Sequence, residues 1–111
     1  METNQVKALK AAINKAIIGL ARKMTQTNDE LLQADLSQQI GSLMAQRANL
    51  SRRMLKKNTK RLDSAIASLD DLTESAKDAK GDVDKVEALI LKSAKTIDKL
   101  TRFVASLAKV V

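Results

Sequence analysis

The residues best suited to chemistry lie in one short basic stretch, SRRMLKKNTKR, at residues 51–61. Six of its eleven residues are basic and none is acidic, and a further arginine stands just upstream. Such side chains neutralise phosphates and release counterions, which gives affinity for nucleic acid of any sequence. The candidate anion or nucleic-acid contacts are Arg47, Arg52, Arg53, Lys56, Lys57, Lys60 and Arg61.

The same stretch also fits the solvated side of a helical rod. On a continuous helix these seven side chains spread around much of the circumference and form no single face. The chain has no tryptophan or tyrosine and one phenylalanine, Phe103, so stacking on the bases of a single strand is not expected. No helix-turn-helix or zinc-finger pattern is present. A solvated stretch is therefore the first interpretation, and nucleic-acid binding is the alternative.

Other chemistry is not expected from this composition. Cysteine and histidine are absent, which removes the usual zinc ligands, and no acids are spaced around a glycine as in a calcium loop. The chain also lacks tyrosine and a phosphate-binding glycine loop, and nothing points to buried carboxylates or lysines in a cleft. We expect no enzyme, no cofactor, no metal and no small-molecule substrate.

The elements that must carry the basic stretch are helices. Strong helix formers dominate, proline is absent, and 111 residues make one domain. Apolar residues recur at steps of three and four from Val6 to Met24, which predicts a first helix at about 3–24. Thr27 and Glu30 have the spacing of a capping box, so the second helix is expected to begin near Asn28.

The end of the second helix is open. The apolar stripes before and after the basic stretch share one sector, which predicts a single helix over 28–80, straight or kinked near 58, about 75 Å long. The alternative is a break at Asn58-Thr59, which are the weakest helix formers there, and hence four helices. Gly81 suits the left-handed position that closes a helix, and the last helix is expected at 83–110.

A seven-residue repeat runs through the second half of the chain, as in a coiled coil. It predicts an all-α fold of antiparallel helices, a bundle or coiled-coil-like hairpins. Asn58 and Ser93 occupy positions of the repeat where a buried polar side chain could fix the register. The predicted interaction face consists of Leu62, Leu69, Leu72, Val83, Val86, Ile90, Ile97, Leu100, Val104 and Leu107.

Charge is unevenly distributed along the chain, whose net charge is +7. Residues 63–87 hold eight acidic and three basic side chains, whereas residues 88–111 hold one acidic and five basic. A hairpin at residue 81 would bring these segments together, so the last helix is expected to pair antiparallel with the acidic segment.

These patterns favour a cytoplasmic, non-enzymatic protein that binds another protein or itself through apolar helix faces. An adaptor, an assembly chaperone, an inhibitor or immunity-type protein, or a structural subunit would fit, and a homo-oligomer is expected. The alternatives are non-specific nucleic-acid binding through residues 47–61 and membrane-surface binding through the basic first and last helices. The lysines that flank the short apolar patch near the start argue against a secretory signal, and no apolar run is long enough to span a bilayer.

Overall fold

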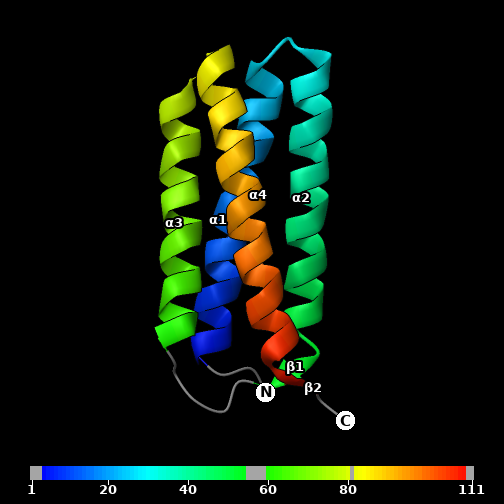
Figure 1. Cartoon of the computed structure of the whole chain (residues 1–111), viewed down its shortest axis with the longest axis vertical. Helices are drawn as coiled ribbons and strands as arrows, with labels where there is room; N and C mark the ends of the chain where they lie inside the picture. Colours follow the sequence, from blue (N-terminus) through cyan, green and yellow to red (C-terminus); the bar gives the residue numbers. More distant parts are fainter. Residues whose placement is uncertain (1–3, 55–59, 81, 110–111) are drawn as a thin grey trace.

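The computed structural model describes residues 4–54, 60–80 and 82–109. Four helices account for nearly all of them: α1 (Asn4–Gln26), α2 (Glu30–Leu50), α3 (Lys60–Ala79) and α4 (Val83–Ser106). They run alternately up and down a long axis of 44 Å, and the other two extents are 22 and 20 Å (Figure 1). The all-α prediction is confirmed.

The prediction of one long central helix over 28–80 is wrong, and the alternative of four helices is confirmed. Helix α2 ends at Leu50, and the next residues form a turn in which Arg52 N–H donates to the carbonyl of Asn49 (3.0 Å). Helix α2 thus ends earlier than the predicted break at Asn58-Thr59, which lie outside the described residues, and α3 begins directly after them at Lys60. A straight rod would give each apolar stripe one partner helix, whereas folding back brings all the stripes into one core.

The helices form two hairpins that pack against each other. Helix α1 packs against α2 and α3, and α4 packs against the same two helices. Helices α2 and α3 therefore occupy opposite corners of the bundle, and the last residue of α2 and the first of α3 lie at the same end of it (Figure 1). This end also holds the start of α1 and the end of α4; we call it the basic end.

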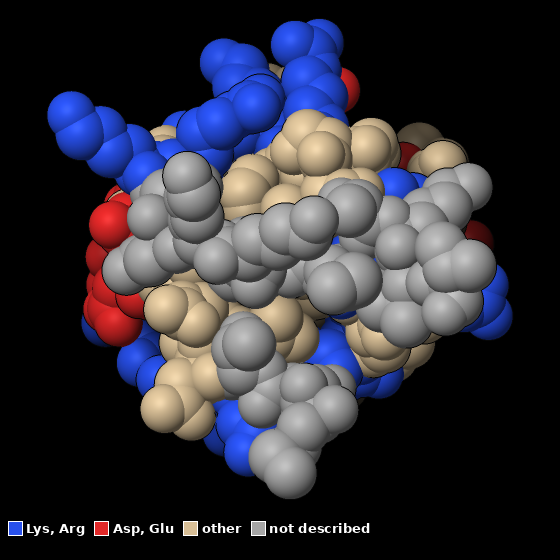
Figure 2. All heavy atoms as spheres, turned by 90° about the horizontal axis from the view of Figure 1, so that it is seen from below, with Lys and Arg blue, Asp and Glu red and all other residues tan. Residues whose placement is uncertain are grey.

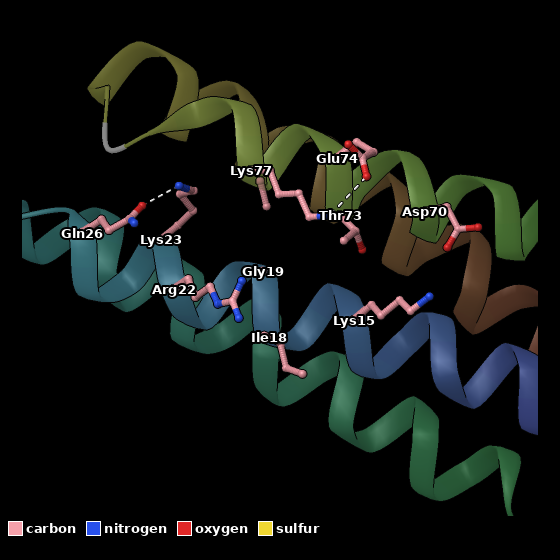
Figure 3. A pocket seen from close by; sticks show the side chains of 11 residues that line it. Lys15, Ile18, Gly19, Arg22, Lys23, Gln26, Asp70, Thr73, Glu74 and Lys77 are labelled. Carbon is pink, nitrogen blue, oxygen red and sulfur yellow. Dashed lines mark hydrogen bonds and ion pairs between the residues drawn. The ribbon is translucent and has the colours of Figure 1, made fainter.

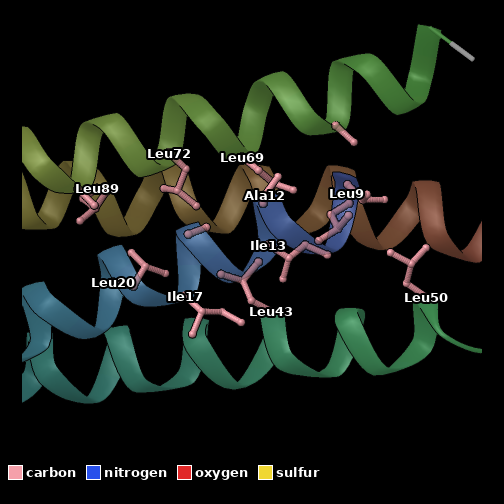
Figure 4. Close-up of a cluster of buried hydrophobic side chains, with 14 of the residues drawn as sticks. Leu9, Ala12, Ile13, Ile17, Leu20, Leu43, Leu50, Leu69, Leu72 and Leu89 are labelled. Atoms are coloured by element: carbon pink, nitrogen blue, oxygen red, sulfur yellow. The ribbon is translucent and has the colours of Figure 1, made fainter. Parts of the chain in front are cut away.

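A single apolar core runs the length of the bundle (Figure 4). Leu9 and Ile13 from α1, Leu43 from α2 and Leu69 and Leu72 from α3 are fully buried. One polar side chain lies in this core at a position of the seven-residue repeat: Ser93 is buried, and its hydroxyl donates to Gln39 Oε1 on α2 (3.0 Å). Burial of about twenty apolar side chains accounts for the compaction without any aromatic cluster.

The start of α2 differs from the sequence prediction, and the end of α3 has a feature that was not predicted. Asp29, not Thr27, caps α2, because its carboxylate accepts hydrogen bonds from the backbone N–H groups of Leu31 and Leu32. At the end of α3 the left-handed backbone conformation belongs to Lys80 (φ 48°). Gly81, which was expected to take it, lies outside the described residues.

Two short strands close the basic end. Strand β1 (Arg53–Met54) pairs antiparallel with β2 (Ala108–Lys109). The guanidinium of Arg53 reinforces this link by donating to the carbonyl of Leu107 (3.0 Å). The chain that leaves α2 is thereby attached to the chain that leaves α4.

Candidate functional site

Because helix α2 ends at Leu50 and the chain turns there, the predicted basic residues that the structure describes lie at one end of the bundle. Arg47 lies in the last turn of α2, Arg52 and Arg53 follow in the turn and β1, and Lys60 and Arg61 begin α3. Lys56 and Lys57 lie outside the described residues. The sequence interpretation spreads these side chains around a rod, whereas the structure brings five of them to the basic end.

The five side chains differ in their contacts. Arg47 donates to Asn14 Oδ1 on α1, and Arg53 holds the carbonyl at the end of α4, so both have structural partners. Arg52, Lys60 and Arg61 are exposed and have no side-chain partner among the described residues. Arg52, Lys60 and Arg61 are therefore available to a partner from solution.

Lys60 and Arg61 stand where helix electrostatics does not favour them. The first turn of a helix carries a partial positive charge that stabilises acids and destabilises bases. Arg47 sits in the last turn of α2, where a cation is favoured, but Lys60 and Arg61 sit in the first turn of α3. Residues that oppose a local rule without a contact that compensates for it are typical of functional positions.

Helix α4 completes this cluster with residues that the sequence analysis missed. Lys60, Arg61, Lys99 and Arg102 line a pocket of about 340 Å³ between the start of α3 and the end of α4, together with Ser64, Asp98 and Phe103. Lys99 donates to Ser68 Oγ (3.3 Å), and Arg102 pairs with Asp98 (3.2 Å) on the exposed surface. The predicted antiparallel pairing of α3 and α4 contained the signal, because it puts the end of one helix beside the start of the other.

The whole bundle is polarised along its axis. We call residues 4–15, 40–54, 60–70 and 95–109 the basic half; it holds twelve basic and three acidic side chains. The acidic half, residues 16–39, 71–80 and 82–94, holds six basic and nine acidic. Viewed from the basic end, Lys and Arg side chains project from several sides of the rim, and the largest group of acidic atoms is at the left edge (Figure 2).

The predicted interaction face lies mostly inside the molecule. Six of its ten members are 0–1% exposed, so a partner cannot reach them in the folded chain: Leu62, Leu69, Leu72, Val86, Leu100 and Val104. Ile90, Ile97 and Leu107 are partly buried against the core, and Val83 is exposed. The seven-residue repeat is thus satisfied within the chain, where α3 and α4 pack against each other, and most of the predicted interaction face is used up by this packing.

Helix α2 combines exposed apolar residues with a long uncharged run. Leu31 and Met44 on α2 are 78% and 44% exposed, and α2 carries no charged residue between 36 and 46. The other exposed residues within that uncharged run are small or polar: Ser37, Gln38, Gly41 and Ala45. None of the other helices that the structure describes has so long an uncharged run with exposed positions in it.

The apolar side of α1 is not available to a lipid surface. Val6, Leu9, Ile13, Ile17 and Leu20 are all buried in the bundle. Among the helices that the structure describes, none has the length and apolar composition that a membrane-spanning segment requires. Within the same residues, Asp and Glu side chains nowhere gather into a group of three that could hold a metal ion.

Comparisons with known proteins match nothing: no family model, no curated protein and no solved structure is similar to this chain.

Proposed function

We propose that this protein is a non-enzymatic nucleic-acid-binding protein that contacts the phosphate backbone with its basic end. The observation that carries the proposal is the convergence of Lys60, Arg61, Lys99 and Arg102 from two helices around one pocket. Arg52, exposed at the same end of the bundle and without a described side-chain partner, adds positive charge there. A nucleic-acid partner also fits the cytoplasmic location expected from the sequence.

The mode of binding follows from the residue types. Phe103 is the single aromatic residue and is buried, so bases cannot stack on an aromatic side chain. Lysine and arginine at the rim neutralise phosphates and contribute no base-specific pattern by themselves. We therefore expect affinity that depends weakly on sequence and strongly on salt. Four or five phosphate contacts would give a slope of about −4 in a plot of log K against log salt.

The test is fluorescence anisotropy with a labelled DNA duplex over a series of salt concentrations. Lys60→Glu with Arg61→Glu should weaken binding by about tenfold or more and reduce the salt slope by about two. The matched control, Lys80→Glu with Lys85→Glu, changes the net charge equally but at the other end of α3 and the start of α4. It should change binding far less.

The two variants also separate binding from folding. Glutamate in the first turn of α3 suits the helix dipole, so the Lys60→Glu, Arg61→Glu protein should remain folded. Equal losses of affinity in both variants would mean that net charge, not the basic end, attracts the DNA. Wild-type protein that does not bind at low salt would contradict the proposal outright.

A second candidate, self-association, rests on the outer side of α2. A helix that is apolar on more than one side is normally buried on more than one side. We propose that a second copy of the chain covers α2 in an antiparallel pair. That arrangement sets the basic half of one copy beside the acidic half of the other, whereas a parallel pair would oppose like charges.

Light scattering after size-exclusion chromatography tests the second candidate. The wild-type protein should elute at twice the chain mass of 12.1 kDa. Ala45→Glu, on the exposed side of α2, should return it to the monomer, whereas the same change at exposed Ala94 on α4 should not. A wild-type monomer at all concentrations would remove this candidate and leave the nucleic-acid proposal intact.

A further inference from the structure

A groove of the described molecule lies away from the basic end, between α1 and α3. It has a volume of about 730 Å³, which is in the range of small-molecule sites (Figure 3). Four basic side chains line it, Lys15, Arg22 and Lys23 from α1 and Lys77 from α3. Two acids of α3, Asp70 and Glu74, also line it, so the groove carries more positive than negative charge even though part of it lies in the acidic half.

The floor of this groove is made by small residues. A Cβ atom added at Gly19 would lie 3.1 Å from the Cβ of Ala76, so α1 and α3 approach closely there. Because neither residue has a long side chain, the space above them stays open between the longer side chains of both helices. Ile18, which is 52% exposed, adds an apolar contact in the same groove.

Lys23 is the unusual member of the groove. It is 5% exposed, and its ammonium has one partner among the described residues, the neutral amide oxygen Gln26 Oε1. Glu74, an acid of α3 that also lines the groove, is paired with Lys77 (3.4 Å). Burying an ammonium without an anion costs free energy, so a buried lysine normally has a carboxylate or phosphate beside it.

Arg22 is a second cation of the groove without a counter-ion among the described residues. Its guanidinium makes no hydrogen bond or ion pair with another described side chain, although it lines the groove next to Lys23 in sequence. In the close-up, Lys23 rises from α1 toward α3 at one end of the groove (Figure 3). Two cations without a counter-ion among the described residues thus border one end of an open space whose floor is apolar.

We propose that this groove binds a small organic anion. Its phosphate or carboxylate group pairs with Lys23 and Arg22, and its apolar or aromatic body covers the floor at Gly19 and Ala76. The proposal is independent of the nucleic-acid proposal, because it uses other residues of the bundle and a ligand of different size.

The experiment is differential scanning calorimetry with adenosine 5′-monophosphate and, separately, benzoate, each at an ionic strength matched with sodium chloride. A groove ligand should raise the Tm of the wild-type protein by about 5 °C at a ligand concentration of about five times its Kd, and further at higher concentrations. Lys23→Met keeps the length of the side chain and removes the charge, so it should abolish the rise. Lys95→Met, at an exposed lysine on α4, is the matched control and should keep it.

Two further results show whether the groove itself holds the anion. Without ligand, Lys23→Met should melt at or above the wild-type temperature, because the buried charge is gone; a clearly lower Tm would make Lys23 part of the fold and overturn the proposal. The Lys60→Glu, Arg61→Glu protein should keep the full rise. Loss of the rise in that variant, an equal rise in Lys23→Met, or no rise with either compound would overturn the proposal.

Discussion

The basic half and the acidic half of this bundle share one apolar core, but their surfaces carry net charges of opposite sign. In the acidic half, an ion pair joins two helices: Lys92 on α4 contacts Asp71 (2.7 Å) and Ser75 (2.7 Å) on α3. In the basic half, Lys60 and Arg61 have no such partner among the described residues and oppose the dipole of α3. The ion pair of Lys92 therefore serves the pairing of α3 with α4, whereas Lys60 and Arg61 are left for a partner.

The largest effect should come from the core that both halves share. Leu69→Ala removes a fully buried side chain near the middle of α3 and should lower the free energy of unfolding by about 3 kcal/mol. Urea unfolding followed by circular dichroism measures it. Leu91→Ala, at an exposed position of α4, is the control and should change stability by less than about 0.5 kcal/mol. Similar losses at both positions would mean that Leu69 is not in the core.

The second-largest change in stability is expected when the two cations at the start of α3 are replaced by acids. Lys60→Glu with Arg61→Glu should raise the free energy of unfolding by about 1 kcal/mol at low salt, because it relieves repulsion and suits the helix dipole. The gain should shrink as sodium chloride screens these charges. Urea titrations at low and high salt measure both quantities. A loss of stability at low salt would show that the two cations support the fold.

A gain of similar size or smaller is expected at the end of α3. Lys80 holds a positive φ, which glycine adopts without the steric cost of a Cβ atom. Lys80→Gly should therefore raise the free energy of unfolding by about 1 kcal/mol. Lys80→Ala, which retains the Cβ atom, should bring no gain. Thermal unfolding of the two variants side by side decides whether backbone conformation is the cause.

The smallest change in the free energy of unfolding is expected for the contacts of Lys92 with α3 in the acidic half. Lys92→Met removes the contacts with Asp71 and Ser75, but both charged side chains are more than one-third exposed. Solvent screening limits the loss to about 0.5 kcal/mol, and high salt should reduce it further. Lys95→Met on the same helix is the control. A loss that salt does not alter would indicate packing of the lysine stem as its origin.

The fold class could be predicted from the sequence because the helical signals are local. The periodicity that gave the first and last helices, and the charges that gave the antiparallel pair α3 and α4, depend on residues close together in the chain. The break after Leu50 could not be predicted in this way. Neither glycine nor proline marks it, and the two stripes of the predicted long helix remain in phase across it. The gain from burying four stripes in one core is a property of the whole chain.

Only part of the candidate site could be predicted from the sequence, because local patterns show which residues are basic but not which segments come together. The basic residues of 47–61 were visible as a run, but their convergence depends on a break that local patterns do not mark after Leu50. The sequence analysis did not single out Lys99 and Arg102, because their pocket with Lys60 and Arg61 exists only when α3 and α4 are paired in three dimensions. The predicted interaction face failed differently: a seven-residue repeat does not say whether its partner helix lies in the same chain.

Binding of nucleic acid at the basic end is tested most directly by a ¹⁵N–¹H correlation spectrum of the protein titrated with a short DNA duplex. We predict that the amides of Arg52, Arg53, Lys60, Arg61, Lys99 and Arg102 shift and that the shifts diminish with added salt. The amides at the other end of the bundle, at residues 29–36 and 82–89, should stay in place. Shifts concentrated in the acidic half or on the outer side of α2, or no shifts at low salt, would contradict the proposed function.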